Sequence, residues 1–273
     1  MAISDISLTA GMRNNLLALQ KTSSQLKLTQ DRLSTGKSVN SALDNPTNFF
    51  AAAGHLERAG DLDVRKDGMS EAIQTVKTAD AGIKAITALI QSAKGLASAA
   101  VATADTLSQM TYESQFTSIQ SQIDRLASDS SYRGINLLTN GSMTIELSTK
   151  TGDAALTING FDSTYNTGLG VTSTTGWTTT ANATQALSMM DSALTTLRSK
   201  SATLASNLSI VTARQDFTNS MINNLQTGSD NLTLADMNSE GANMLMLQTR
   251  QSLGTTALSL SSQAAQSILR LFQ

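Results

Sequence analysis

The most regular hydrophobic pattern in the sequence lies near its C-terminal end, between Met244 and Phe272. Apolar residues recur there every three or four positions, which is the spacing of one face of an α-helix. They are Leu253, Ala257, Leu260, Ala264, Ile268 and Leu271, with a second row beside them at Leu258, Ala265 and Phe272. The apolar surface is therefore wider than a contact between two helices requires. Because a soluble monomer rarely leaves such a strip in water, the pattern predicts a helix that needs partners.

A similar but weaker row follows the N-terminal residues, where a helix is expected from Ile3 to Leu33. Its apolar members are Met12, Leu16, Leu19, Leu26 and Leu33. Ser23 and Gln30 stand where a heptad repeat would carry hydrophobic residues, so they weaken the contact and can fix its register. We expect the two terminal helices to pair and the surplus apolar face to pack against neighbouring molecules. Packing inside a single chain remains the commoner fate of such a row.

A second helix is expected from Thr47 to about Ala104, after a turn-rich stretch that begins at Gly36. Asn45 suits the N-cap of this helix, and Pro46, the only proline, suits its first position. Five glycines interrupt its apolar pattern, at Gly54, Gly60, Gly68, Gly82 and Gly95. Close approach of neighbouring helices is the interpretation favoured for them, since a glycine inside a helix otherwise costs about 1 kcal/mol relative to alanine.

Two further helices are expected, one before and one after residues 139–180, where the helical spacing of apolar residues is absent. Thr106 with Gln109 resembles a capping box for a helix that stops near Ser130. Asn182 with Gln185 resembles another, for a helix that ends at Gly228.

Between Thr139 and Thr180 the helical spacing disappears. Apolar and polar residues alternate instead, at Met143, Ile145 and Leu147 and again at Leu156 and Ile158. This alternation predicts a β-hairpin, followed by a loop that holds the only tryptophan, Trp177.

The predicted fold class is therefore mainly α: a long, discontinuous helical bundle with paired, coiled-coil-like N- and C-terminal helices and a small β-hairpin insertion. Its expected domains are a terminal domain of residues 1–43 and 229–273, a long-helix bundle of 44–138 and 181–228, and a surface insertion of 139–180.

Composition narrows the functional classes. Aromatic residues make up only 4% and charged residues 15% of the 273 residues, and the net charge is −2. A weakly charged chain lacks the basic surface that nucleic acid or an anionic membrane attracts, so we expect neither nucleic-acid binding nor membrane insertion. No apolar run approaches the ~20 residues of a membrane span. The first residues do not resemble a secretory signal peptide, and without cysteine there is no disulfide or thiolate metal site.

Short motifs of enzymes occur in the sequence but lack their usual setting. Gly36-Lys37-Ser38 ends like a phosphate-binding loop, yet Asp31 stands where that motif needs a glycine. Ser34 with Lys37, Ser229-Asp230-Asn231 and Lys150-Thr151-Gly152 together match the motifs of serine β-lactamases, but in the wrong order and without the expected sheet. His55 is the only histidine and cannot build a histidine-rich metal site. We therefore expect no catalytic residue, metal or cofactor.

Four ordered segments resemble bacterial flagellin. They are LSTGKSVNSALDNP from Leu33 to Pro46, DGMSEAIQTVKTADAGI from Asp67 to Ile83, SYRGINLL from Ser131 to Leu138, and the C-terminal segment from Leu234 to Phe272. The first holds the signature turn of the family, at Gly36, Asn40, Ser41, Asp44, Asn45 and Pro46. The resemblance covers roughly residues 1–138 and 182–273.

The resemblance implies a subunit that polymerises, alone or mixed with other flagellins, into the extracellular filament used for swimming. The paired terminal helices would form an inner tube, the longer helices an outer tube, and the insertion would face the medium. It also implies unfolded export through the flagellar type III apparatus, a chaperone on the C-terminal segment, and assembly beneath a cap next to hook-associated proteins. The filament-packing residues would be the apolar rows of the two terminal helices.

Two alternatives remain open at this point. The hook–filament junction protein of the same superfamily would normally carry a larger insertion. A helical signalling rod would need membrane anchors and symmetric heptads, and neither is apparent. Ser92 and Gly95 also depart from the segment that the flagellin-sensing innate receptor recognises, so we expect weak activation, and a strong response in a receptor reporter assay would refute this.

Overall fold

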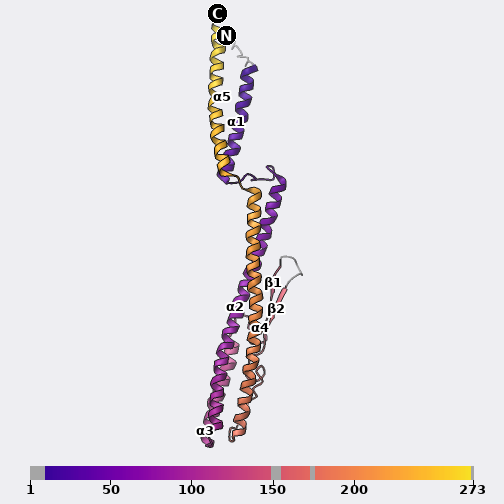
Figure 1. Cartoon of the computed structure of the whole chain (residues 1–273), viewed down its shortest axis with the longest axis vertical. Coiled ribbons are helices and arrows are strands. Elements are labelled where there is room, and N and C mark those ends of the chain that lie inside the picture. Colours follow the sequence, from indigo (N-terminus) through magenta and orange to yellow (C-terminus); the bar gives the residue numbers. More distant parts are fainter. Residues whose placement is uncertain (1–9, 149–154, 173–175, 272–273) are drawn as a thin grey trace. The chain divides into compact units, whose positions relative to one another are not determined.

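The computed structural model describes residues 10–148, 155–172 and 176–271, and within them five helices and a two-stranded sheet (Figure 1). In chain order these are α1 (Ala10–Thr35), α2 (Pro46–Ala102), α3 (Thr106–Asp129), β1 (Ser142–Glu146), β2 (Ala155–Asn159), α4 (Thr180–Thr233) and α5 (Met237–Leu271). The predicted mainly α fold class is confirmed. Contacts divide the chain into two compact units, residues 1–57 with 224–273 (the terminal unit) and residues 58–223 (the second unit). The division into three domains stays a prediction.

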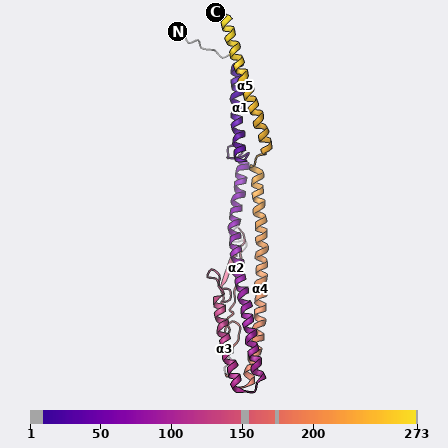
Figure 2. The same ribbon diagram turned by 90° about the vertical axis from the view of Figure 1, so that its left-hand side faces the viewer.

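In the terminal unit, α1 and α5 run side by side in opposite directions, as both views show (Figure 2). The predicted pairing of the terminal helices is therefore confirmed. α1 ends where Gly36 adopts a φ of 71° and donates its N–H to the carbonyl of Arg32 at 2.8 Å. Such a left-handed residue directly after a helix is a common helix stop, and glycine adopts it without strain.

The second unit holds a continuous apolar core to which α2 from Met69 onward, α3 and the first half of α4 contribute. Its largest fully buried side chains include Met69, Ile86, Ile90, Phe116, Ile123, Met190 and Leu197. With the smaller core residues between them, such as Ala72, Val76 and Ala79 in α2, the core positions of each helix recur every three or four residues, so a single stripe of each helix faces the core.

The hairpin belongs to the same core. β1 and β2 are antiparallel, with Met143 opposite Ile158 and Ile145 opposite Leu156. Ile145 and Ile158 are buried, as the alternation of apolar and polar residues predicts. Residues 149–154 between the strands, which include Lys150 to Asp153, lie outside the described part of the chain.

Trp177 anchors the loop that leads to α4. Its ring is fully buried and lies 4.9 Å, centroid to centroid, from the ring of Phe116. Both carboxylate oxygens of Glu113 accept backbone hydrogen bonds, from the N–H of Gly176 at 2.6 Å and from that of Trp177 at 2.9 Å. The predicted loop is therefore a packed part of the second unit.

Three helix boundaries differ from the sequence-based predictions. The N-cap of α3 is Asp105, whose carboxylate accepts the N–H of Ser108 at 3.0 Å, rather than Thr106. Aspartate is the stronger cap because its charge also favours the positive end of the helix. α4 begins at Thr180 instead of Asn182, and it continues through Gly228 to Thr233. A helix tolerates an internal glycine at a cost of about 1 kcal/mol relative to alanine. Because of this cost, the sequence pattern predicted the end of the helix at Gly228.

The interpretation of the glycines in α2 is confirmed only for Gly82. A Cβ there would collide with the hydroxyl of Ser130 and lie 2.6 Å from Cδ1 of Leu138. In the described part of the chain, no atom outside the helix backbone lies within 4 Å of a Cβ on the other four: Gly54, Gly60, Gly68 and Gly95. These four face solvent, so close packing within the chain does not explain them.

One helix of the described residues, α2, is long and apolar enough to cross a membrane, with a window of 18 residues at a mean hydropathy of 1.3. The sequence-based statement that no such run exists was therefore too strict. Composition of this kind also occurs in core helices of soluble proteins. Ile83, Ile86, Ile90, Ala93 and Ala97 of α2 lie in the core of the second unit, which favours that interpretation.

Candidate interaction surface of the terminal helices

α1 and α5 contact each other along one stripe of each helix. Met12 and Thr29 of α1 are buried, and Leu247 of α5 is only 5% exposed. The partly covered positions extend these into two rows, Leu19, Thr22, Leu26 and Leu33 on α1 and Met244, Gln251, Gly254 and Leu258 on α5. Both rows have the alternating spacing of three and four residues that a coiled coil uses. Since most of these side chains are only partly covered, the contact is thin.

Every second contact position on α1 differs by one residue from the prediction, whereas Met12, Leu19, Leu26 and Leu33 lie where they were expected. Ser23 and Gln30, expected in the contact, are exposed, and Thr22 and Thr29 take their place. The Thr22 hydroxyl donates to the carbonyl of Ala18 at 2.9 Å, so its polar group is satisfied within the helix. Its methyl group is then free to pack, which a simple division into apolar and polar residues does not reveal. Leu16, also expected in the row, is 36% exposed.

The predicted apolar row of α5 lies beside the contact with α1. Leu253 is 64% and Leu260 61% exposed, and Ala257 and Ala264 are exposed as well. Leu253 and Ala257 are each one residue, or about 100° around the helix, from the covered row, and Leu260 and Ala264 continue their spacing of three and four residues. Met246, seven residues before Leu253, continues the line. We call Met246, Leu253, Ala257, Leu260 and Ala264 the uncovered face of α5.

The side chains of Ile268 and Leu271 lie outside the described part, so their place relative to this face stays a prediction. Of the row predicted on α1, Met12, Leu19, Leu26 and Leu33 lie in the contact with α5. The packing of these residues in a filament stays a prediction.

The turn between α1 and α2 is held by side chains of the residues singled out from the sequence. The carboxylate of Asp44 accepts the N–H groups of Asn40 and Ser41, at 3.0 and 2.9 Å, and the hydroxyl of Ser41 at 3.1 Å. These donors, the backbone N–H of Ser41 foremost, hold the pKa of Asp44 below its usual value because they stabilise the charged carboxylate.

The start of α2 follows the sequence-based prediction. Asn45 accepts the N–H of Asn48 through its side-chain oxygen at 3.1 Å, and Pro46 occupies the first helical position. Asn45 is therefore the predicted N-cap, and proline fits because its missing N–H would have no helical partner there.

The same turn is fastened to the junction between α4 and α5. The backbone N–H of Ser38 donates to the carbonyl of Thr233 at 2.7 Å, and the Ser38 hydroxyl donates to the carbonyl of Leu234 at 3.0 Å. Arg32, near the end of α1, forms a half-buried ion pair with Glu240 at 3.0 Å. Residues from the two ends of the sequence thus meet at this point, which pattern analysis did not anticipate because they are about 200 positions apart.

The described residues contain no constellation suited to chemistry. No group of three or more possible metal ligands lies among them. Ser34 is exposed, Ser229 is buried among helix residues, and Lys150 lies outside the described part. These positions are consistent with the expectation that the enzyme-like motifs of the sequence are coincidental.

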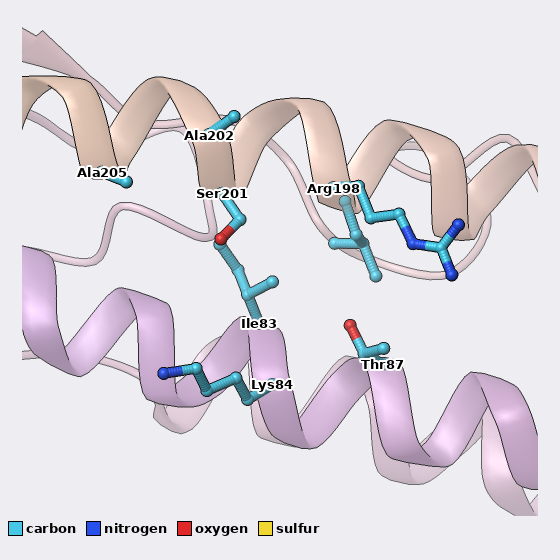
Figure 3. A pocket seen from close by; sticks show the side chains of 8 residues that line it. Ile83, Lys84, Thr87, Arg198, Ser201, Ala202 and Ala205 are labelled. Atoms are coloured by element: carbon cyan, nitrogen blue, oxygen red, sulfur yellow. The ribbon is translucent and has the colours of Figure 1, made fainter.

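A shallow groove of about 410 Å³ lies between α2 and α4 in the second unit (Figure 3). Ile83 and Ser201 point toward each other across it, whereas Lys84 and Arg198 extend along their helices in opposite directions. The Ser201 hydroxyl donates to Asp80 at 3.3 Å, and Lys84 pairs with the same carboxylate at 2.7 Å. Asp80, the carboxylate that Ser201 contacts, is already paired with Lys84, and the groove is shallow, so we treat it as packing between helices.

Comparisons with known proteins point to one family. The family model of the bacterial flagellin N-terminal helical region matches residues 6–143, and that of the C-terminal helical region matches residues 187–272. Flagellins FljM and FljK of Caulobacter vibrioides are each 31% identical to the chain over the whole length of both proteins. The flagellin of Brucella melitensis is 28% identical over 94% of this chain and 95% of its own. A crystal structure of Bacillus cereus flagellin shares the fold, with a TM-score of 0.50 at 21% identity over 55% of this chain and 88% of that one.

Proposed function

The chain belongs to the bacterial flagellin family and is a structural subunit of the extracellular flagellar filament, not an enzyme, and we propose that its copies contact one another through the uncovered face of α5. The single observation that carries this proposal is the exposure of Leu253 and Leu260, at 64% and 61%, on a helix whose other side already packs against α1. The relatives that match over the whole chain are flagellins, which favours a filament subunit over the junction protein and the signalling rod.

The energetic argument follows from burial. Covering one leucine fully is worth roughly 1.5–3 kcal/mol, and each copy carries two leucines and a methionine in line on this face. The contact between α1 and α5 is thin, so pairing within one chain leaves this gain unused. Stacked copies that cover the uncovered face would obtain it at every contact.

We also propose that the chain is arranged in the filament as the family resemblance implies. The terminal helices, residues 1–43 and 229–273, would form the inner tube, residues 44–138 and 181–228 the outer tube, and residues 139–180 would face the medium. Met12, Leu16, Leu19, Leu26 and Leu33 would pack in the inner tube together with the row from Leu253 to Leu271.

An uncovered apolar face also has to be shielded before assembly. We therefore extend the proposal to export through the flagellar type III apparatus, with a chaperone on the C-terminal segment and with cap and hook-associated proteins at the assembly site. The absence of cysteine from the sequence supports this route, because a chain without disulfides can be unfolded without reduction. A chaperone that co-purifies equally well with a chain lacking residues 237–273 would contradict the proposed place of the chaperone.

Seeded elongation tests the contact directly. Purified chain is added to filament fragments, and growth is compared for the wild type and the double variant Leu253→Ser, Leu260→Ser. We expect elongation of the variant to slow by more than about tenfold, since each contact loses the burial of two leucines.

The matched control is Leu107→Ser with Met110→Ser, which removes two apolar side chains, 74% and 53% exposed, from α3. It should elongate faster than the α5 variant. An α5 variant that elongates at the wild-type rate would contradict the proposed contact, and a wild type that never elongates would contradict filament formation by this chain.

A further inference from the structure

The ionised side chains of the terminal unit are segregated by sign. Over residues 10–30 of α1 and 241–271 of α5 the sequence has no aspartate or glutamate, whereas Arg13, Lys21, Lys27 and Arg250 are exposed on these helices. We call this stretch, residues 10–30 with 241–271, the cationic half.

The rest of the unit has the opposite balance. Residues 31–57 and 224–240 hold six carboxylates, Asp31, Asp44, Glu57, Asp230, Asp236 and Glu240, against the two cations Arg32 and Lys37. We call this stretch the acidic half. Three of its carboxylates serve the fold, because Glu240 pairs with Arg32, Asp44 holds the turn and Asp236 accepts the N–H groups of Asn238 and Ser239 at the start of α5.

The other three carboxylates, those of Asp31, Glu57 and Asp230, are exposed and have no side-chain partner among the described residues. The four exposed cations likewise form no ion pair in the described part of the chain. Lys27 lies one helical turn before Asp31 but does not pair with it. Lys21 lies ten residues, or ~15 Å, from Asp31 along the helix. This is more than the Debye length of about 8 Å at physiological salt, so Asp31 of the same chain neutralises Lys21 poorly.

A groove lies within the cationic half. It has a volume of about 420 Å³, opens between α1 and α5, and has Lys21 and Arg250 on its walls. The other lining residues are Asn15, Ala18, Leu19, Thr22, Gln25 and Gly254, so the amide groups of Asn15 and Gln25 accompany the two cations. A space of this size, with two cations and two amide donors, suits a carboxylate side chain.

The carboxylate that enters the groove can come from a second copy of the chain in a filament. In a helical polymer each contact joins two different surfaces of identical copies, so one surface can be basic and the other acidic. Resting on the proposed filament function, we propose that the cationic half of one copy docks on the acidic half of a second copy, with an unpaired carboxylate of the latter entering the groove between Lys21 and Arg250. The docking gives the stack a direction, because like halves repel each other.

A charge-swap experiment tests the docking in the full-length chain. One variant carries Lys21→Glu and Arg250→Glu, so its groove has two carboxylates in place of two cations. The other carries Asp31→Lys and Asp230→Lys, so two of its three unpaired carboxylates become cations. Growth from wild-type filament fragments is followed for each variant alone, for their equal mixture, and for the chain with all four changes.

Each variant alone should grow at least about tenfold more slowly than the wild type, because the groove and the side chain that enters it then carry charges of the same sign. The mixture and the fourfold variant should grow within about threefold of the wild type, since opposite charges meet again in both. Circular dichroism and the fluorescence of Trp177 verify that each variant is folded.

The control, Lys77→Glu with Arg125→Glu, makes the same change in net charge at exposed positions of the second unit. A control as slow as the Lys21, Arg250 variant would overturn the proposal, because net charge would then explain the loss. Wild-type growth by either variant alone, or failure of the mixture to recover, would overturn it too. Failure of the wild type to grow would instead count against the filament function on which the proposal rests.

Discussion

At position 254 of α5, the absence of a side chain decides how closely α1 can approach. A Cβ there would lie 2.8 Å from Cδ1 of Leu19, which is closer than carbon atoms normally pack. Gly241, in the same helix, has no such neighbour within 4 Å in the described part of the chain. The two glycines therefore form a matched pair for substitution.

We predict that Gly241→Ala stabilises the terminal unit by up to about 1 kcal/mol, the usual helix preference of alanine over glycine. Gly254→Ala should give a smaller gain or a loss, because Leu19 has to move. Thermal unfolding followed by circular dichroism measures both. Equal gains at the two positions would show that Gly254 has no role in the approach of α1.

Asp44 makes the turn between α1 and α2 sensitive to acid. A carboxyl whose pKa is lowered on folding stabilises the folded state above its unfolded pKa, about 4 for aspartate, and this contribution is lost as the pH falls through the folded pKa. Asp44→Asn should therefore lower the melting temperature at neutral pH. The difference from the wild type should shrink below about pH 3, where the wild-type carboxyl also becomes neutral.

The control for this prediction is Asp230→Asn, at an exposed aspartate without a side-chain hydrogen bond among the described residues. Its effect on the melting temperature should not follow the same course with pH. A difference between wild type and Asp44→Asn that stays constant from pH 7 to pH 3 would mean that the charge of Asp44 does not hold the turn.

At the scale of the element, the glycines of α2 divide into one that is packed and four that are open. Gly82→Ala should destabilise the second unit by about 1–3 kcal/mol, because Ser130 and Leu138 leave no room for the added methyl group. Gly95→Ala, in the same helix and with open space around it, should stabilise by up to about 1 kcal/mol. Urea unfolding followed by Trp177 fluorescence measures both, and destabilisation at both positions would contradict the distinction.

The helices and the hairpin could be predicted from the sequence because their signals are local. The spacing of apolar residues, the Asn45–Pro46 start of α2 and the alternation around Ile145 and Ile158 each depend on a few neighbouring residues. The end of α4 was missed, because Gly228 looks like a stop and only the surrounding structure keeps it helical.

The interaction surface was predicted in part. The apolar row of α5 was found, but the side that faces α1 was not, because a shift of one residue turns a helix by about 100°. Thr22 and Thr29 escaped notice since threonine counts as polar, although its hydroxyl can bond within the helix. The ion pair of Arg32 and Glu240 joins distant parts of the sequence, and no local pattern could reveal it.

At the scale of the molecule, the two units differ in how well they bury their own apolar residues. The second unit encloses Trp177, Phe116 and a continuous set of aliphatic side chains from its helices and its hairpin. The terminal unit buries few side chains and leaves the uncovered face of α5 in solvent. A subunit with this contrast can fold in part alone and complete its burial only among copies of itself, as a filament protein requires.

The most direct test of this account measures the accessibility of the uncovered face before and after assembly. Because the chain has no cysteine, Leu260→Cys provides a single thiol on α5, and Asn166→Cys provides one at an exposed position of the second unit. The rate of labelling by a soluble maleimide is measured for each variant as monomer and as filament. We expect the thiol at position 260 to react readily in the monomer and at least about a hundredfold more slowly in the filament, because neighbouring copies bury it. The thiol at position 166 should react at similar rates in both states, and equal rates in monomer and filament at position 260 would contradict the account.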